Sequence, residues 1–340
     1  MTARDIQADA SLHELVASAV GSAEADHALA VLTINLAIPT GGEQTARAEL
    51  AIALNVALFA DLLKRVPTAA AYVGEVAARG ERIVFDHGAL RTIDGETGAL
   101  PRGLTAFARI LEPLGYAVGG TYPLPRLRMT GKAFVQQDFP ETIPQFFVSE
   151  LHVAELDAKA QPAATRVFAT SRDPLGPVEE EALAVLASDG AVPRALALAA
   201  LPGLVAAFGC QHEVPTLADY ETLLADSKEA AWIATEGNAF NHATTRVPDV
   251  DTLAAALKAA GKPMKAEVEV SANRRVRQTA FLADTVERRF LLPDGRSIAR
   301  TVPGSFYEFI TRDVDPATGS LDLTFDSGNA TGIFAVTGAR

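Results

Sequence analysis

Three ionisable side chains, each inside an apolar strand-like run, place the strongest constraint on how this chain can fold. His87 lies in RIVFDHGALRTI, His242 in AFNHATTRV and Glu308 in SFYEFITRD. Burying such a group is costly unless the fold compensates it. Two neutral imidazoles and one carboxylate are also the donor set of the facial triad that holds non-haem iron(II) and leaves coordination positions open. The three residues are far apart in the sequence, so only the tertiary fold could assemble them into one site.

His87 and Arg91 are four residues apart in the run HGALR. Residues at this spacing share one face of a strand, so the imidazole and the guanidinium would point into the same cavity. Arginine is suited to hold a carboxylate through two parallel hydrogen bonds. The pair therefore indicates a metal ligand beside a substrate-binding cation, although a His and an Arg at this spacing are more often two surface side chains.

The strand expected around His242 would carry Thr244 and Arg246 on the same face and Asn241 and Thr245 on the opposite face. A buried histidine does not require a metal, because a neighbouring carbonyl can accept its N–H. Taken alone, His242 is better explained as a half-buried histidine than as a ligand.

Glu308 has the least polar surroundings of the three, since aromatic and aliphatic residues flank it on both sides. An ionised carboxylate there needs a cation or several hydrogen bonds. Arg312 would share its face four residues later, so an ion pair between the two is the alternative to metal ligation. The residues alone leave both possibilities open.

Other reactive side chains give weaker signals. His152 follows FFVSEL and is expected either to line a cavity or to lie in the core, and Cys210 is expected to serve packing. The chain has no G-x-S-x-G nucleophile elbow, no phosphate-binding P-loop and no Rossmann glycine motif. These absences disfavour a serine hydrolase and a nucleotide-dependent enzyme.

The 340-residue chain has a formal net charge of −12, which disfavours binding to duplex nucleic acid. A single cysteine excludes a disulfide framework and a Cys-rich zinc site, and it suits a reducing compartment. The most apolar stretches are shorter than the roughly 20 residues that a spanning helix needs, and no export signal is expected. We therefore expect a cytoplasmic protein that binds a small molecule and neither nucleic acid nor membrane.

Helical and strand periodicities occur in separate blocks, which indicates an α+β fold. Helices are predicted over 11–20, with Ser11 as the N-cap, and over 43–65, 104–114 and 250–260. Strands are predicted over 82–93, 116–122, 132–137, 145–155, 240–247, 266–270, 277–283, 287–292, 297–302, 306–313 and 321–326.

The blocks divide one predicted domain into four parts. These are an N-terminal helical part (1–80), a first strand-rich part (81–160), an Ala- and Leu-rich helical insertion (161–235) and a second strand-rich part (236–340). Each strand-rich part supplies ligand candidates, as expected if two similar modules pack around one site.

Several motifs, in order, resemble the 2-oxoadipate dioxygenase/decarboxylase family, also called D-2-hydroxyglutarate synthases. They are HGALRT, PRLRMTGKAF…PETIPQFFVSELH, GNAFNHATTRV, RQTAFLAD, FYEFITRD and the C-terminal NATGIFAVT, and together they span about residues 46–337. The resemblance implies a fold related to the vicinal-oxygen-chelate enzymes, with curved strands around one metal site, N-terminal helices and a helical insertion.

The same resemblance implies a chemistry. His87, His242 and Glu308 match the ligands of non-haem Fe(II) in the family, and Arg91 matches its substrate-carboxylate residue. The family reaction converts 2-oxoadipate and O2 to 2-hydroxyglutarate and CO2, and the 2-oxo acid lies within the substrate itself. The chain departs from the family pattern at Gln278-Thr279-Ala280, which leaves the length of the 2-oxo acid open.

The same residues are also compatible with two functions other than an iron-dependent oxygenase. The same donors could hold Zn or Mn in a vicinal-oxygen-chelate isomerase, lyase or hydrolase. The chain could also be a non-catalytic small-molecule binding relative. Candidates for the distal substrate carboxylate are Arg128, Lys132, Arg246 and Arg275, and neither their order nor the product stereochemistry and oligomeric state follows from the sequence.

Overall fold

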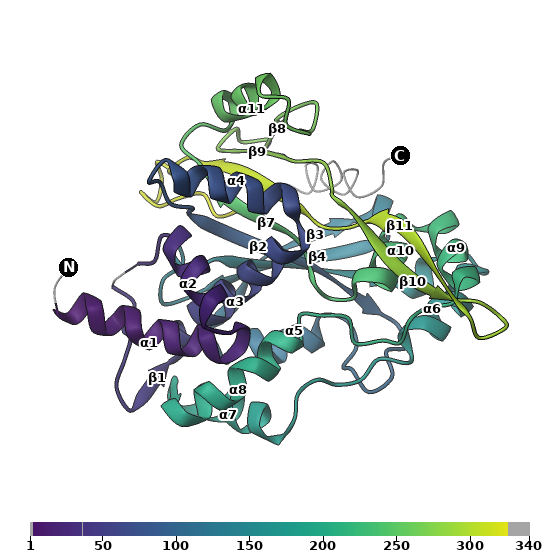
Figure 1. Ribbon diagram of the computed structural model, residues 1–340, viewed down its shortest axis with the longest axis horizontal. Helices are drawn as coiled ribbons and strands as arrows, with labels where there is room; N and C mark the ends of the chain where they lie inside the picture. Colours follow the sequence, from purple (N-terminus) through teal and green to yellow (C-terminus); the bar gives the residue numbers. More distant parts are fainter. Residues whose placement is uncertain (1–2, 36, 326–340) are drawn as a thin grey trace.

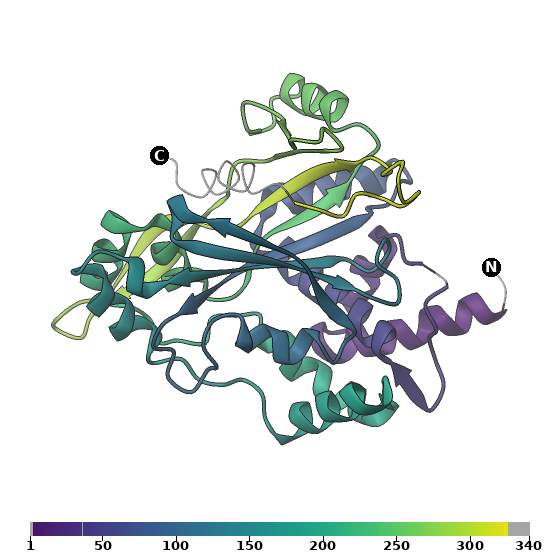
Figure 2. The ribbon, with the colours of Figure 1, turned by 180° about the vertical axis from the view of Figure 1, so that it is seen from behind.

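The protein is built around one strongly twisted sheet with helices packed on its outer side, as the computed structural model shows in Figures 1 and 2. The structure describes residues 3–35 and 37–325. The sheet has eight strands in the order β3-β4-β5-β2-β7-β12-β9-β8. The strands are β2 (Phe85–Asp94), β3 (Tyr116–Leu124), β4 (Met129–Gln136), β5 (Gln145–His152), β7 (Phe240–Arg246), β8 (Glu269–Val270), β9 (Val276–Ala280) and β12 (Phe306–Arg312).

The sheet consists of two four-stranded modules with the same topology. In the first, β2 runs parallel to β5, and β5, β4 and β3 follow antiparallel to one another. In the second, β7 runs parallel to β12, and β12, β9 and β8 follow antiparallel. A helix follows the first strand of each module, α5 (Thr105–Leu111) after β2 and α11 (Val250–Ala259) after β7. The antiparallel pair β2–β7 joins the modules, so both first strands lie at the centre of the sheet.

The outer face of the central strands is covered by α3 (Arg47–Arg65) and α4 (Pro67–Ala78). In α3, 15 of 19 residues are buried, since neighbouring helices surround it on the side away from the sheet. Phe59 of α3 packs against Phe85 and Tyr307, and Tyr72 of α4 packs edge-on against Phe309. This aromatic layer fixes the outer side chains of β2 and β12 and turns their alternate residues to the inner face.

The helices between β5 and β7 pack in two different places (Figure 1). Helices α7 (Pro177–Asp189) and α8 (Arg194–Ala206) share a core with α1 (Ala3–Val20), α2 (Ser22–Val31) and α3. A second core joins α6 (Ala160–Phe168), α9 (Leu217–Asp226) and α10 (Lys228–Glu236) to a separate hairpin, β10 (Thr285–Leu291) and β11 (Ser297–Pro303). Among the described residues, no helix is both long enough and apolar enough to cross a membrane.

Several predicted elements are wrong in their bounds, and three of them are instructive. The first helix begins at Ala3, so Ser11 is not its N-cap, and the Ser11 hydroxyl instead donates to Glu49 at 2.6 Å. The helix predicted over 43–65 begins only at Arg47, because β1 (Gln44–Ala46) pairs with β6 (Ala191–Pro193). In the strand predicted over 321–326, Leu321 forms an isolated bridge, 322–325 have no regular structure and residue 326 lies outside the described part. In the second case the long-range pairing of β1 with β6 overrides the local helix propensity.

Gly88 marks a close approach between the central strands and the outer core. A Cβ at this position would lie 2.2 Å from Cζ of Phe240. We expect Gly88→Ala to lower the free energy of unfolding by about 1–3 kcal/mol, because the buried ring must move. The matched control is Gly74→Ala in α4, where nothing lies within 4 Å of the added Cβ. That change should leave stability equal or raise it by up to about 1 kcal/mol. Urea unfolding of both variants measures the difference.

Candidate metal centre

The inner face of the sheet brings His87, His242 and Glu308 together where the two modules meet. One potential ligand atom from each lies within 4.8 Å of the other two. His87 Nε2 is 3.7 Å from Glu308 Oε1, and His242 Nε2 is 3.9 Å from Glu308 Oε2. These separations exceed a hydrogen bond but suit three donors around one ion at about 2 Å each. The geometry therefore assembles a possible metal site from residues far apart in the sequence.

Strand register explains how the three residues meet. His87 on β2 lies opposite Thr244 on β7, and Thr244 lies opposite Glu308 on β12. His242 occupies the next row of the same face, opposite Ala89. The Thr244 hydroxyl lies 3.1 Å from His87 Nε2 and donates to Glu308 Oε1 at 3.1 Å. Thr244 therefore lies between His87 and Glu308 and sets the distance between them.

A β-bulge precedes each of the two histidines. On β2 the register shifts between Phe85 and His87, which makes Asp86 the extra residue; on β7 it shifts so that Asn241 is the extra residue. A bulge breaks the alternation of faces and re-aims a side chain. The prediction that Asn241 faces away from His242 is therefore wrong, because its amide Nδ2 lies 3.0 Å from His242 Nδ1.

The bulged residues determine which imidazole nitrogen faces the centre of the site. Asp86 Oδ1 lies 2.8 Å from His87 Nδ1 and accepts a hydrogen bond from Nδ1–H, which leaves the Nε2 lone pair for a metal. Asn241 can do the same for His242, since a 180° turn of the amide brings Oδ1 to Nδ1–H. No described residue hydrogen-bonds to Asn241 Oδ1, so this turn breaks no bond at that oxygen.

Arg312 holds Asp86 rather than Glu308. Its Nε and Nη2 both lie 3.0 Å from Asp86 Oδ1, and Arg246 Nε is 3.3 Å from Oδ2. Burial acts to raise the pKa of Asp86, but Arg312, His87 and Arg246 together lower it well below its usual range. The predicted alternative, an ion pair between Glu308 and Arg312, is wrong, because the bulge at Asp86 places a closer carboxylate beside the guanidinium.

Glu308 therefore lacks a direct cationic partner among the described residues. Burial raises its pKa to about 8, and the nearby Glu269 adds to this effect, while Lys265 and the Thr244 hydroxyl oppose it. Its Oε2 atom has no hydrogen-bond partner in the described chain. A bound cation would compensate this carboxylate, so the donor set and its environment fit a divalent metal ion.

Burial also lowers the pKa of both histidines. For His242 the positive side chains Arg91 and Lys265 and the neighbouring His87 lower it further. Neutral imidazoles are the form that binds a metal. The two nitrogen donors are therefore ready for ligation at neutral pH.

Arg91 is fully buried on the face of β2 that carries His87. It lies opposite Ser149 on β5, and its guanidinium carbon is 5.0 Å from the centre of the Trp232 ring. Burial lowers its pKa only to about 10, and Glu229 opposes that shift, so the side chain stays charged. Its charge is felt at His242, which places a permanent cation within electrostatic reach of the metal centre.

The other sequence candidates lie elsewhere or are engaged. Arg128 contacts Asp226, and Arg275 contacts Asp322. Arg246 borders Asp86 and donates to the Glu141 carbonyl, while Lys132 pairs with Val148 in a row on the outer face.

His152 bridges Asp94 and Thr130 at 2.8 Å each, near one end of the sheet. The roles of Asp86, Asn241 and the Lys265–Glu269 pair are not predicted from the sequence, where the signal for the first two is a polar residue directly before each histidine.

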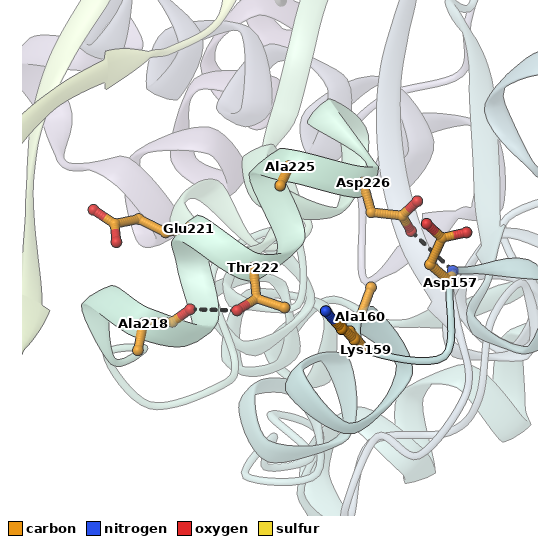
Figure 3. A pocket seen from close by; sticks show the side chains of 8 residues that line it. All are labelled: Asp157, Lys159, Ala160, Ala218, Glu221, Thr222, Ala225 and Asp226. Carbon is orange, nitrogen blue, oxygen red and sulfur yellow. Dashed lines mark hydrogen bonds between the residues drawn. The ribbon is translucent and has the colours of Figure 1, made fainter.

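A surface pocket of about 550 Å3 lies away from these ligands, between α6 and α9 (Figure 3). Its wall is held by short contacts such as Asp157 N to Asp226 Oδ2 at 3.1 Å and Thr222 Oγ1 to the Ala218 carbonyl at 2.7 Å. None of the metal-ligand candidates lines it. The lining residues are Asp157, Lys159, Ala160, Ala218, Glu221, Thr222, Ala225 and Asp226.

Comparisons with known proteins find a matching family model and proteins of similar sequence and fold. A family model described as 2-oxoadipate dioxygenase/decarboxylase matches residues 55–319. A crystal structure of a glyoxalase-superfamily protein from Ralstonia eutropha is 50% identical, with a TM-score of 0.89 over 93% of this chain and 98% of that one. A rice 2-oxoadipate dioxygenase/decarboxylase is 25% identical over 81% of this chain and 75% of its own length.

The fold is shared more widely than the sequence. The structure of rice hydroxyglutarate synthase in complex with 2-oxoadipate superposes with a TM-score of 0.67 at 22% identity, over 88% of this chain and 97% of that one. The predicted α+β, vicinal-oxygen-chelate-like architecture is therefore confirmed. The C-terminal NATGIFAVT motif lies outside the described residues.

The pKa of Glu308 makes metal binding depend on pH. Below pH 8 the metal-free carboxyl, with its pKa of about 8, holds a proton that a metal must displace. Affinity should therefore rise about tenfold per pH unit from roughly pH 6 to 8 and level off above. Because burial lowers the pKa of both histidines, they contribute little in this range.

Cobalt(II) affinity, measured by chelator competition from pH 6 to 9, checks this dependence. Glu308→Gln should bind far more weakly and without the slope. A flat profile in the unmodified protein would contradict the assignment of Glu308 as a ligand.

Proposed function

The chain belongs to the 2-oxoadipate dioxygenase/decarboxylase family, and we propose that it is an iron(II)-dependent oxygenase that decarboxylates a 2-oxo dicarboxylic acid. In its specific form, the proposal has 2-oxoadipate and O2 as substrates and 2-hydroxyglutarate and CO2 as products. The observation that carries it is the buried His87, His242 and Glu308 cluster, with Arg91 on the same face of β2. Such a donor set on one side of an ion leaves the other side open.

When bound, iron(II) would supply adjacent positions for the 2-oxo carboxylate and for O2. His87, His242 and Glu308 would hold it. The overall reaction balances without an external reductant. Reduction of O2 takes four electrons: oxidative decarboxylation of the 2-oxo acid supplies two, and hydroxylation of a C–H bond of the shortened chain supplies the other two, so both atoms of O2 enter the products. No separate 2-oxo acid cosubstrate is therefore required.

Arg91 would bind the distal carboxylate of the substrate and set its orientation. A buried guanidinium forms strong paired hydrogen bonds to a carboxylate because water does not compete. The chain of the substrate between the metal and Arg91 would then be held in one position, which contributes to rate through proximity. The distance between Arg91 and the metal would select the chain length.

Apolar side chains enclose the inner face around the ligands. The Phe306 ring lies 4.7 Å from the His242 ring, and Phe147 packs against Tyr122 at 5.6 Å. All three ligand side chains are at most 5% exposed. Such enclosure limits access of bulk water to the reacting atoms and favours reaction within the bound substrate.

The first functional test measures O2 consumption and CO2 release with 2-oxoadipate and iron(II). Turnover should depend on O2, and His242→Ala should lose at least about 100-fold in rate, because a two-donor site holds metal weakly. Turnover that continues without O2 would instead favour a vicinal-oxygen-chelate isomerase, lyase or hydrolase. Full activity in His242→Ala would contradict the proposed metal site.

A second test examines Arg91. We expect the native protein to prefer 2-oxoadipate over 2-oxohexanoate, which lacks the distal carboxylate, and Arg91→Met to remove that preference. Loss of charge-assisted hydrogen bonds of about 1.5–3 kcal/mol predicts a fall of roughly 10- to 100-fold in kcat/KM for the dicarboxylate alone. Arg109→Met is the control, since Arg109 pairs with Asp173 through two hydrogen bonds outside the site. An equal loss for both substrates would assign Arg91 a structural role.

A further inference from the structure

Arg312 contacts two parts of the molecule that both border His87. On one side it forms a paired ion contact with Asp86, which in turn holds His87 Nδ1. On the other side its Nη1 donates to the backbone carbonyls of Asp322 and Thr324, both at 2.9 Å. Its side chain is fully buried. All three nitrogens of this guanidinium are therefore engaged, and together they connect Asp86, the hydrogen-bond partner of His87, to the backbone of residues 322–324.

That segment, residues 322–325, is here called the strap. Its last residue, Phe325, meets the His87 ring edge-on at 4.8 Å, and its ring also packs 4.9 Å from that of Phe147. Arg312 lies 5.0 Å from the centre of the Phe325 ring. The strap thus covers one side of the ligand His87 within the inner face of the sheet.

The strap is fastened by polar contacts as well. The Phe325 amide donates to the Tyr122 hydroxyl at 3.0 Å, and Gln145 donates to the Leu323 carbonyl at 3.4 Å. Neither contact belongs to a regular ladder of secondary structure. Asp322 anchors the start of the strap, because its carboxylate accepts from Arg275 at 2.7 Å and from Asn273 at 2.9 Å. Opening of residues 323–325 would break only the contacts beyond this anchor and would leave the sheet intact, so this part of the strap can respond to events at the site.

We propose that Arg312 is a positioning residue that couples the metal ligand His87 to the strap, so that metal binding and closure of the strap stabilise each other. A metal at Nε2 fixes the His87 ring, which provides the surface for Phe325. The same ion orients Asp86 through Nδ1, and Asp86 orients the fork of Arg312 that holds two strap carbonyls. Linkage of this kind is reciprocal, so a closed strap must also strengthen metal binding.

The proposal rests on the metal site of the proposed function but on neither its substrate nor its reaction. It also gives the closed site an entry route. Substrate must reach ligands that are almost fully buried, and release of the strap uncovers His87 without disturbing the strands that carry the three donors. The strap is therefore placed to open for substrate and to close over it.

Hydrogen exchange and cobalt(II) binding test the coupling without turnover. In the native protein, cobalt(II) should slow exchange of the strap amides at least tenfold. Arg312→Lys keeps the charge but loses the fork, and should weaken cobalt(II) affinity by roughly 10- to 100-fold. It should also remove the metal-induced slowing. The control Arg109→Lys, which alters a paired Arg–Asp contact elsewhere, should change neither.

Asp86→Asn provides a second variant that preserves side-chain shape if Arg312→Lys does not fold. It should weaken cobalt(II) binding and abolish the metal-induced slowing of hydrogen exchange in the strap. The proposed coupling is overturned if cobalt(II) binds to the native protein without slowing exchange of the strap amides. It is also overturned if either variant binds cobalt(II) with native affinity and shows the native slowing. If the native protein does not bind cobalt(II), the metal site itself is overturned. If the coupling is normal but no 2-oxo acid is turned over, only the proposed reaction is overturned.

Discussion

The buried charge of Asp86 determines much of the organisation around the site. A carboxylate at 3% exposure survives in the core only if cations and hydrogen bonds offset its desolvation. Arg312 supplies the charge, and His87 supplies a donor. That arrangement occupies Arg312 and leaves Glu308 without it, so the second carboxylate needs a different cation. The ion pair that satisfies one acid therefore leaves the other to hold a proton or, when a cation is bound, to act as its ligand.

The two modules explain why three protein donors, not four, surround the centre. In the β2–β7 pair, His87 lies opposite Thr244 and Ala89 lies opposite His242. A two-fold axis between these two rows would exchange β2 with β7 and would place each histidine on the position of the other. On β12, Glu308 lies opposite Thr244, which is two positions after His242. The equivalent residue of β2 is Ala89, two positions after His87, and the residue opposite Ala89 on β5 is Phe147. An aromatic ring therefore stands where symmetry would place a second carboxylate. A metal ion at this point would therefore have three protein donors, and this difference between the modules would leave its other coordination positions open.

Periodicity predicted much of this site from the sequence. The strands around His87, His242 and Glu308 lie close to the predicted bounds, and alternation placed His242, Thr244 and Arg246 on one face. What it could not reveal are the two bulges, since an extra residue in a strand depends on its pairing partner. Asp86 and Asn241 consequently had no expected role, and Arg312 was paired with the wrong acid. The division into 1–80, 81–160, 161–235 and 236–340 stays a prediction, although the helices between β5 and β7 join two separate cores.

The balance of charge at the centre also bears on what binds there. Asp86 is offset by Arg312 and Arg246, and Glu269 is paired with Lys265 at 2.5 Å, which leaves Glu308 as the acid without a paired arginine or lysine among the described residues at the site. A divalent ion held by His87, His242 and the ionised Glu308 would keep one net positive charge together with these three side chains, and in a buried site such a charge strongly favours an anion. A chelating 2-oxo carboxylate neutralises that charge with one end of the molecule. Any second carboxylate then needs its own buried cation, and Arg91 stands on the same face of β2 to meet it.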